Sequence, residues 1–259
     1  MSQITLTALP DFPLVQPGDD LAKQILESLE TINLSLNDTD VLVLAQKIVS
    51  KSENRYAYLN DIVVGEEAQA LSIEVDKDPR LVELILSESK EVVRHRPGVV
   101  IVEHNLGYVH ANAGIDKSNI SSDAENPRVL LLPINSDASA DKLRKDLFEK
   151  TGKNVFVIIN DSAGRAWRNG TVGMAIGSSG FAALEDLIGL DDLFDRPLEI
   201  SQVAVADELA AGASFLMGQA AEGSPVVLIR GAQLTAIKSP SVDTGTSSLI
   251  REKSMDLFR

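Results

Sequence analysis

The chain has 259 residues, of which 38 are acidic and 24 basic, so its formal net charge at pH 7 is -14. Such a charge repels a phosphate backbone, and we expect no nucleic-acid partner. The absence of cysteine excludes disulfides, thiolate catalysis, iron–sulfur clusters and cysteine-based zinc sites. No basic leader and no window of 18 uncharged apolar residues occurs, so we expect a cytoplasmic protein that does not enter a membrane.

The first part of the chain predicts short strands alternating with amphipathic helices. A strand around Leu6 comes first, and a helix is predicted over residues 21–33, where aspartates precede an apolar pattern of helical period. Residues 40–46, DVLVLAQ, have the short apolar run of a buried strand. Residues 47–60 are predicted as a loop that presents basic and polar groups from the end of that strand.

The middle of the chain predicts two acidic helices and an antiparallel hairpin. The helices are expected at 65–77 and 79–91, the second opening with a proline in its first turn. Residues 98–112 predict two strands about a tight turn at His104–Gly107. A loop rich in Ser, Asp and Asn follows at 116–126.

The remaining segments predict further strands and helices, with no internal repeat and no long linker. Strands are expected at VLLLP, NVFVIIN, residues 199–205 and SPVVLIRG, helices at SADKLRKDLFEKTG and DELAAGASFLMGQ, and a loop at DSAGRAWRNG. The last twenty residues are polar and are expected on the surface or across a partner. Because a hairpin and closely spaced strands favour antiparallel pairing, we predict an α+β fold with mixed, largely antiparallel sheets and flanking helices. We expect residues 1–259 to form one unit, which could contain two interleaved subdomains.

Two carboxylates share one setting, each just beyond an apolar strand. They are Asp116 in NAGIDKSN and Asp161 in INDSAGRAWR. With the hydroxyl of Ser162 they could supply hard oxygen ligands to Mg²⁺ or Mn²⁺. The alternative is that both aspartates form Asx turns, which is the more common use of this residue. Neither the G-x-G-x-x-G nor the P-loop pattern occurs, so spacing alone predicts no nucleotide.

Basic residues could bind a phosphate or a substrate carboxylate. Arg165 and Arg168 flank Trp167, and Lys47 and Lys51 follow an apolar strand. Surface ion pairs and solvated lysines explain the same residues equally well. The three histidines, His95, His104 and His110, are spaced too irregularly for a helical metal motif and are interpreted as structural. The glycines between 170 and 180 suit either a ligand's approach to the backbone or tight packing.

Several segments together resemble the coenzyme F420-0:L-glutamate ligase family in order and spacing. They are DVLVLAQKIVSKSE, HANAGIDKSN, LLLP, VIINDSAGRAWRNGTVGMAIGSSG, VADELAAGASFLMGQ, PVVLIRG and the ending SSLIREKSMDLFR. The resemblance covers nearly the whole chain. It implies a GTP-dependent amide ligase that uses Mg²⁺ or Mn²⁺, with K⁺ as a further candidate ion, in an intertwined homodimer. Its small-molecule substrates would be GTP, L-glutamate and a deazaflavin coenzyme precursor.

The resemblance also implies roles for individual residues. Those matching the family's metal positions are Asp116, Asp161, Ser162 and Gln219, and those proposed as catalytic are Asp116, Asp161 and Arg165. Those at its GTP positions are Phe12, Pro13, Leu14, Val15, Gln46, Lys47, Lys51, Asn119, Met217, Gly218, Gln219, Gly223 and Ser224. Gln46 and Lys47 replace a small hydroxyl pair found in some members, and Ser162 stands where threonine is also seen.

The mechanism implied by the resemblance passes through an acyl phosphate. The precursor's lactyl carboxylate attacks the γ-phosphate of GTP, and the amine of glutamate then displaces phosphate; a repeat on the new γ-carboxylate would extend a γ-glutamyl tail. Two alternatives stay open. One is a paralogous ligase with another carboxylate substrate, and the other is a nucleotide-binding dimer without turnover.

Overall fold

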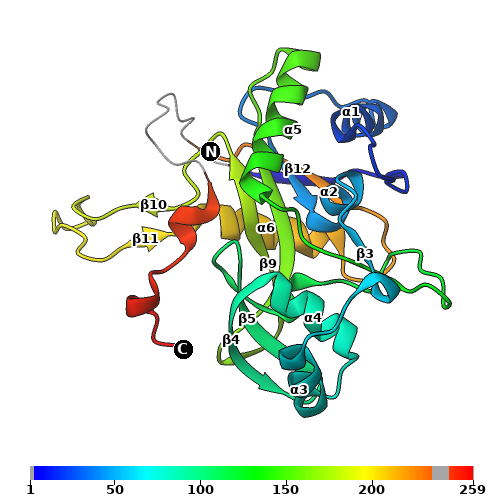
Figure 1. Ribbon diagram of the computed structural model, residues 1–259. Coiled ribbons are helices and arrows are strands. Elements are labelled where there is room, and N and C mark those ends of the chain that lie inside the picture. The colour runs from blue at the N-terminus through cyan, green and yellow to red at the C-terminus, as the bar shows by residue number, and fades with distance from the viewer. Residues whose placement is uncertain (1–2, 235–244, 259) are drawn as a thin grey trace.

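The computed structural model describes residues 3–234 and 245–258, and its centre is a five-stranded sheet of order β1-β12-β2-β8-β9 (Figure 1). The strands are β1 (Thr5–Ala8), β12 (Val226–Arg230), β2 (Val41–Ala45), β8 (Phe156–Arg165) and β9 (Arg168–Ser179). Every neighbouring pair is antiparallel except β2 and β8, which run parallel with Ala45 opposite Asn160. The residues that follow Ala45 and Asn160 therefore meet at one edge of the sheet.

Helices cover both faces of this sheet because side chains along each strand alternate between the faces. Leu42 and Leu44 pack on one side with α1 (Leu21–Thr31), α2 (Gln46–Ser52) and α5 (Ser136–Thr151). Val41 and Val43 pack on the other side against α6 (Val205–Met217). Figure 1 shows α5 and α6 on opposite sides of the sheet.

A second, smaller core lies below the sheet in Figure 1 and is called the small unit here. It contains α3 (Glu66–Val75), α4 (Pro79–Ser87) and the antiparallel sheet of β4 (Ser89–Arg96), β5 (Val99–His104) and β6 (Val109–Ala111). A short pair, β3 (Tyr56–Tyr58) with β7 (Arg128–Leu130), joins it to the central sheet. In sequence, the small unit is inserted between β2 and β8.

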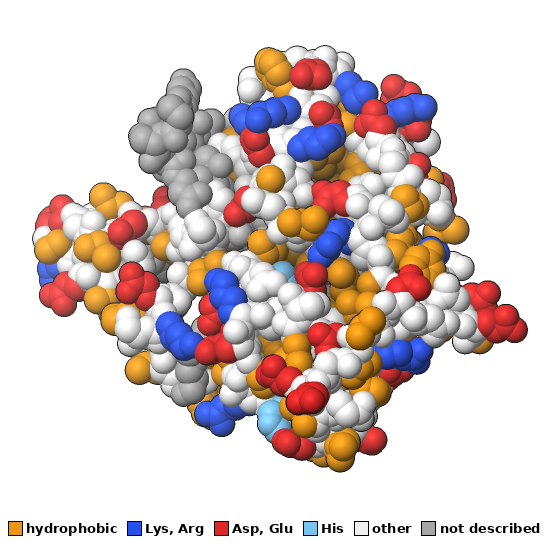
Figure 2. Space-filling model, viewed as in Figure 1, with side chains coloured by type: hydrophobic (Ala, Val, Ile, Leu, Met, Phe, Trp, Pro, Cys, Tyr) orange, Lys and Arg blue, Asp and Glu red, His pale blue; other side chains and the backbone are white. Residues whose placement is uncertain are grey.

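A narrow arm stands away from the body of the protein (Figure 1). It carries the two-stranded pair β10 (Glu185–Asp186) and β11 (Gln202–Val203). Among its exposed side chains, Leu193 is 98% exposed, and hydrophobic groups are visible on the arm in Figure 2. The C-terminal segment returns to the body through two 3-10 turns, Thr246–Leu249 and Lys253–Met255. Of the last twenty residues, predicted at the surface or across a partner, Gly245 and Thr246 are buried and the other described ones are exposed or half-buried; residues 240–244 and 259 lie outside the described residues.

The predicted α+β class with mixed, largely antiparallel sheets is confirmed. Three segment predictions were wrong in extent. Residues 47–60 are not a continuous loop: α2 begins directly after β2 and buries Ile48 and Val49 in the core. The helix predicted to reach residue 91 ends at Ser87, because the following residues pair with β5. The strand predicted at 199–205 is reduced to Gln202–Val203, since α6 starts at Val205.

The loop predicted at DSAGRAWRNG, after NVFVIIN, is mostly strand in the structure. Strand β8 continues through residues 161–165, and β9 starts at Arg168. The ladder continues because β8 and β9 pair with each other along their whole length, so a polar sequence does not end the strand. Asp161 is consequently a strand residue whose side chain is only 13% exposed.

Candidate functional site

A cavity of about 520 Å³ opens where β2 ends beside Asn160 of β8, and is called the β2–β8 cavity here. Five stretches of chain form its wall: the segment before α1, the β2–α2 junction, residues 119–120, β8 beyond Ile159, and the end of α6 with the loop after it. The lining residues are Phe12, Pro13, Leu14, Val15, Ala45, Gln46, Lys47, Ile48, Lys51, Asn119, Ile120, Asn160, Asp161, Ser162, Ser214, Met217, Gly218, Gln219, Ala220, Ala221, Glu222, Gly223, Ser224 and Pro225. Every position predicted to bind GTP lies in this wall.

Asp116 reaches the same edge from the segment that follows β6. Its backbone exchanges two hydrogen bonds of 2.9 Å with Leu130. The bend before it needs Gly114, because φ is +65° there and a Cβ would lie 2.6 Å from the Leu132 side chain. The Asp116 carboxylate accepts a 2.7 Å hydrogen bond from Gln46 Nε2 and lies 3.4 Å from Lys47 Nζ. Asp116 therefore contacts two residues that line the β2–β8 cavity, Gln46 and Lys47.

The pKa of Asp116 depends on its burial and on the charges around it. Burial, with a further contribution from the charge of Asp161, raises the pKa of the Asp116 carboxyl although Lys47 opposes the shift. On the other wall, burial and the charges of Lys47 and Arg128 lower the pKa of the Lys51 ammonium. This edge thus holds two carboxylates close together on one side and two lysines on the other. A ligand that carries both a cation and phosphates would reduce the repulsion on each side.

His110, interpreted from the sequence as structural, lies directly behind Asp161. Its Nε2 is 3.1 Å from Asp161 Oδ2, and the ring is 8% exposed. Burial lowers the pKa of His110, but the bond to Asp161 and the charge of that carboxylate outweigh it, so the net shift is upward. No local sequence signal indicated this contact, because it depends on how β6 lies beside β8.

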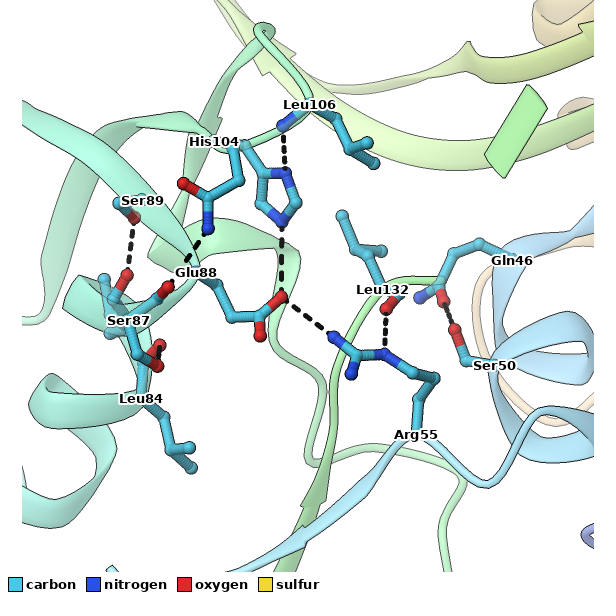
Figure 3. A network of polar contacts seen from close by, with 12 residues as sticks. Gln46, Ser50, Arg55, Leu84, Ser87, Glu88, Ser89, His104, Leu106 and Leu132 are labelled. Carbon is cyan, nitrogen blue, oxygen red and sulfur yellow. Dashed lines mark hydrogen bonds and ion pairs between the residues drawn. The ribbon is translucent and has the colours of Figure 1, made fainter. Parts of the chain in front are cut away.

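The other buried histidine, His104, belongs to a different polar network, which Figure 3 shows. Its Nε2 lies 3.8 Å from Glu88 Oε2, and Arg55 donates a 2.9 Å hydrogen bond to the same oxygen. Burial, assisted by the charge of His110, lowers the pKa of His104 to about 4. Arg55 also donates to the Leu132 carbonyl at 2.7 Å, so this network fastens the small unit to the wall beside the cavity.

The four predicted metal ligands are all hard oxygen donors. Asp161, Ser162 and Gln219 line the β2–β8 cavity, and Ser162 Oγ donates a 2.7 Å hydrogen bond to Gln219 Oε1. Within the described ranges no group of three or more His, Cys, Asp or Glu side chains is arranged to hold a metal ion. The predicted set contains two carboxylates, completed by a hydroxyl and an amide, all of them oxygen donors of the kind that hard divalent cations prefer. The donor chemistry therefore fits Mg²⁺ or Mn²⁺.

The cavity wall is closed by contacts between distant segments. Lys51 Nζ donates to the Asn119 carbonyl at 2.7 Å, and Asn119 Nδ2 donates to the Ala220 carbonyl at 3.0 Å. Arg165, in contrast, is not brought to the cavity. It lies near the exposed tip of the β8–β9 hairpin, where its guanidinium donates to the Gly170 carbonyl at 3.2 Å. Trp167 at this tip is 87% exposed.

Comparison with known proteins gives a consistent result. Residues 11–231 match the family described as F420-0:Gamma-glutamyl ligase. The chain is 43% identical over 256 residues to coenzyme F420:L-glutamate ligase of Methanothermobacter thermautotrophicus, covering 99% of both chains. It is 43% identical over 242 residues to the protein of that name from Methanocaldococcus jannaschii, covering 91% of this chain and 93% of the relative. The matched region contains both aspartates and the whole β2–β8 cavity, and this chain belongs to the F420-0:gamma-glutamyl ligase family.

Proposed function

We propose that this chain joins the amine of L-glutamate to the lactyl carboxylate of coenzyme F420-0, using GTP to activate that carboxylate. The observation that carries the proposal is the coincidence of two independent facts. The chain matches ligases named for F420 and L-glutamate over almost its full length, and its β2–β8 cavity combines carboxylates, lysines and a glycine-containing loop at one edge. Family membership supports amide-bond formation, and the cavity supports a phosphorylated nucleotide as the energy source.

The cavity divides into regions suited to different parts of GTP. Phe12 and its neighbours give an apolar wall for the purine, while Lys47 and Lys51 can offset phosphate charge. The loop from Gly218 to Gly223 allows a close approach of its backbone, since both glycines have positive φ. The choice of GTP over ATP rests on the family resemblance.

Asp116, Asp161, Ser162 and Gln219 would hold Mg²⁺ or Mn²⁺, with K⁺ as a further ion of the same oxygen-rich edge. When bound, a divalent ion supplies charge neutralisation for the triphosphate. Lys47 is paired with Asp116 in the structure, and phosphate oxygens can draw that ammonium away and free the carboxylate. The protein's own contribution is to hold the reactants in line and to exclude water.

The chemistry needs an activated carboxylate because oxide is a poor leaving group. In the first step a carboxylate oxygen of F420-0 attacks the γ-phosphorus of GTP; the bond to the β,γ-bridging oxygen breaks and GDP leaves. In the second step the glutamate nitrogen attacks the acyl carbon of the resulting acyl phosphate. Inorganic phosphate leaves, the amine loses a proton, and an amide is formed. Further rounds can add γ-linked glutamates.

The test is whether release of phosphate from GTP requires both other substrates. Purified protein should release phosphate with GTP, Mn²⁺, L-glutamate and F420-0 present together, and a folded Asp161→Asn variant should not. Release without F420-0, or with a different carboxylate acceptor only, would favour a paralogous ligase. Tight GTP binding without any turnover would favour a nucleotide-binding dimer. Equal or faster turnover with ATP would refute the nucleotide assignment alone.

We also propose that the active form is a homodimer in which the arm of residues 185–203 contacts a second copy. The support is the exposure of Leu193, Phe194 and Ile200, which are 98%, 74% and 87% exposed on a narrow projection (Figures 1 and 2). Large exposed apolar side chains gathered in one place mark association surfaces. Sedimentation at micromolar concentration should give twice the chain mass, and a fully active monomer would contradict the proposal.

A further inference from the structure

His110 meets the candidate site only through Asp161. Its Nε2 lies 3.1 Å from Asp161 Oδ2, yet the histidine is absent from the wall of the β2–β8 cavity, which Asp161 itself lines. The partners of Asp116 differ in this respect, because Gln46 and Lys47 both line the cavity and can contact a ligand. A ligand can therefore displace the partners of Asp116, whereas it cannot reach His110 without moving Asp161.

The imidazole of His110 is held on its other sides as well. Its Nδ1 lies 3.1 Å from the Ala111 carbonyl, which can only accept, so Nδ1 carries a proton. The ring of Tyr108 packs against it edge-on with centroids 6.2 Å apart, and Tyr108 also stacks on His104 at 5.2 Å. His104 is in turn fixed by the backbone N–H of Leu106, which donates to its Nδ1 at 3.0 Å. These contacts leave His110 little freedom to turn.

We propose that His110 is a positioning residue that fixes one carboxylate oxygen of Asp161 and so presents the other oxygen to a divalent cation in the β2–β8 cavity. This inference rests on the proposed function, in which Asp161 is a metal ligand. A carboxylate that is free to rotate loses conformational entropy when it binds a cation, and a buried partner removes that loss in advance. Outer partners of metal-binding side chains typically change metal affinity by about 10- to 100-fold when they are removed.

Two substitutions separate the two ring nitrogens of His110. In His110→Gln the side-chain amide nitrogen can reach the position of Nε2, 3.1 Å from Asp161 Oδ2. In His110→Asn the amide is one methylene shorter, so it can replace only Nδ1 and its contact with Ala111. Tyr108→Phe is the matched control, because it removes a buried hydroxyl that has no hydrogen-bond partner in the described structure and leaves the stacked rings in place.

The measurement is binding of Mn²⁺ to the purified full-length chain, followed by the electron paramagnetic resonance signal of free Mn²⁺, with thermal melting of each variant. We expect His110→Asn to weaken Mn²⁺ binding by about 10- to 100-fold. His110→Gln and Tyr108→Phe should bind Mn²⁺ as wild type does. Loss of affinity in the Asn variant with recovery in the Gln variant would not arise from general destabilisation.

Two results would overturn the inference while leaving the proposed function intact. The first is wild-type Mn²⁺ affinity in a folded His110→Asn variant. The second is an equal loss in the Asn and Gln variants, because reach to Asp161 would then not matter. If the wild-type chain binds no Mn²⁺ even with GDP present, the metal assignment within the proposed function fails, and the role of His110 fails with it.

Discussion

Substitution of Gly173 by alanine should displace α6 and so lower both the stability of the protein and the affinity of the β2–β8 cavity for its ligand. Gly173 lies in β9, opposite Ser162, directly under α6. An alanine Cβ there would lie 2.5 Å from the Ala210 carbonyl oxygen, 2.5 Å from Ser214 Cβ and 2.6 Å from Asn160 Oδ1. Ordinary contacts of this kind begin at 3.4 Å, so the helix has to retreat by nearly an ångström.

The expected cost follows from overpacking, which destabilises a well-packed interior by about 1 to 3 kcal/mol. For a chain of this size each kcal/mol lowers the melting temperature by about 2 to 4 °C, so Gly173→Ala should melt roughly 2 to 12 °C below wild type. Nucleotide affinity should also fall, because α6 ends at Met217 and leads into the Gly218–Gly223 wall of the cavity.

Gly164→Ala supplies the control, since Gly164 lies in the same hairpin, has no positive φ and would place its Cβ with nothing within 4 Å. That variant should melt at or slightly above the wild-type temperature, because alanine reduces the entropy of the unfolded chain. The assay is thermal denaturation followed by circular dichroism, with nucleotide binding by calorimetry. If Gly173→Ala and Gly164→Ala melt together and bind GTP equally, α6 does not pack against β9 as described.

Three further outcomes are expected. Asp161→Asn should lose Mn²⁺-dependent turnover, measured by phosphate release, while the chain stays folded; its stability should fall by about 1 to 3 kcal/mol, because the carboxylate beside the buried His110 is lost. Wild-type turnover would remove this residue from the site. Arg230→Met should lower the free energy of unfolding, measured by urea denaturation, by about 3 kcal/mol, because Asp40 is 2% exposed and accepts two hydrogen bonds from that guanidinium, at 2.9 and 2.6 Å. An unchanged denaturation midpoint would contradict the pairing. Lowering the pH from 6.5 towards 4 should protonate His104 only in the unfolded chain, since its folded pKa is about 4, and the protein should lose about 1.4 kcal/mol of stability per pH unit. His104→Gln should lose less stability over this range. A variant and a wild type with the same dependence of stability on pH would argue against a neutral buried imidazole.

The sequence predicted the fold class well because its strongest signals are local. The run DVLVLAQ gives β2, the turn at His104–Gly107 gives the β5–β6 hairpin, and Gly152 ends α5 in the left-handed conformation. The predicted ends of segments were wrong where hydrogen bonding between strands decided the structure and the local composition did not. The polar residues after Asn160 continue β8 because β9 supplies hydrogen-bond partners, and no feature of their own composition predicts a strand.

Most residues of the candidate site could be named from the sequence, but the contacts between them could not. The setting of Asp116 and Asp161 after apolar strands indicated that both could reach one edge, and the structure brings their surroundings together there. The contact of His110 with Asp161 depends on how β6 of the small unit lies beside β8, which is a long-range arrangement without a local sequence signal. Arg165 is close in sequence to Asp161, but the extended strand carries it away along the hairpin, and it does not line the β2–β8 cavity.

The parallel pairing of β2 with β8 also has a consequence for how the protein reaches its native state. The two strands are separated in the chain by residues 46–155, which include the whole small unit. Antiparallel neighbours such as β8 and β9 can form early because a short turn joins them, whereas the β2–β8 ladder requires closure of that long loop and its entropic cost. The cavity edge exists only once this ladder is in place, so nucleotide recognition should be among the last properties acquired during folding, after the hairpins and helices have formed.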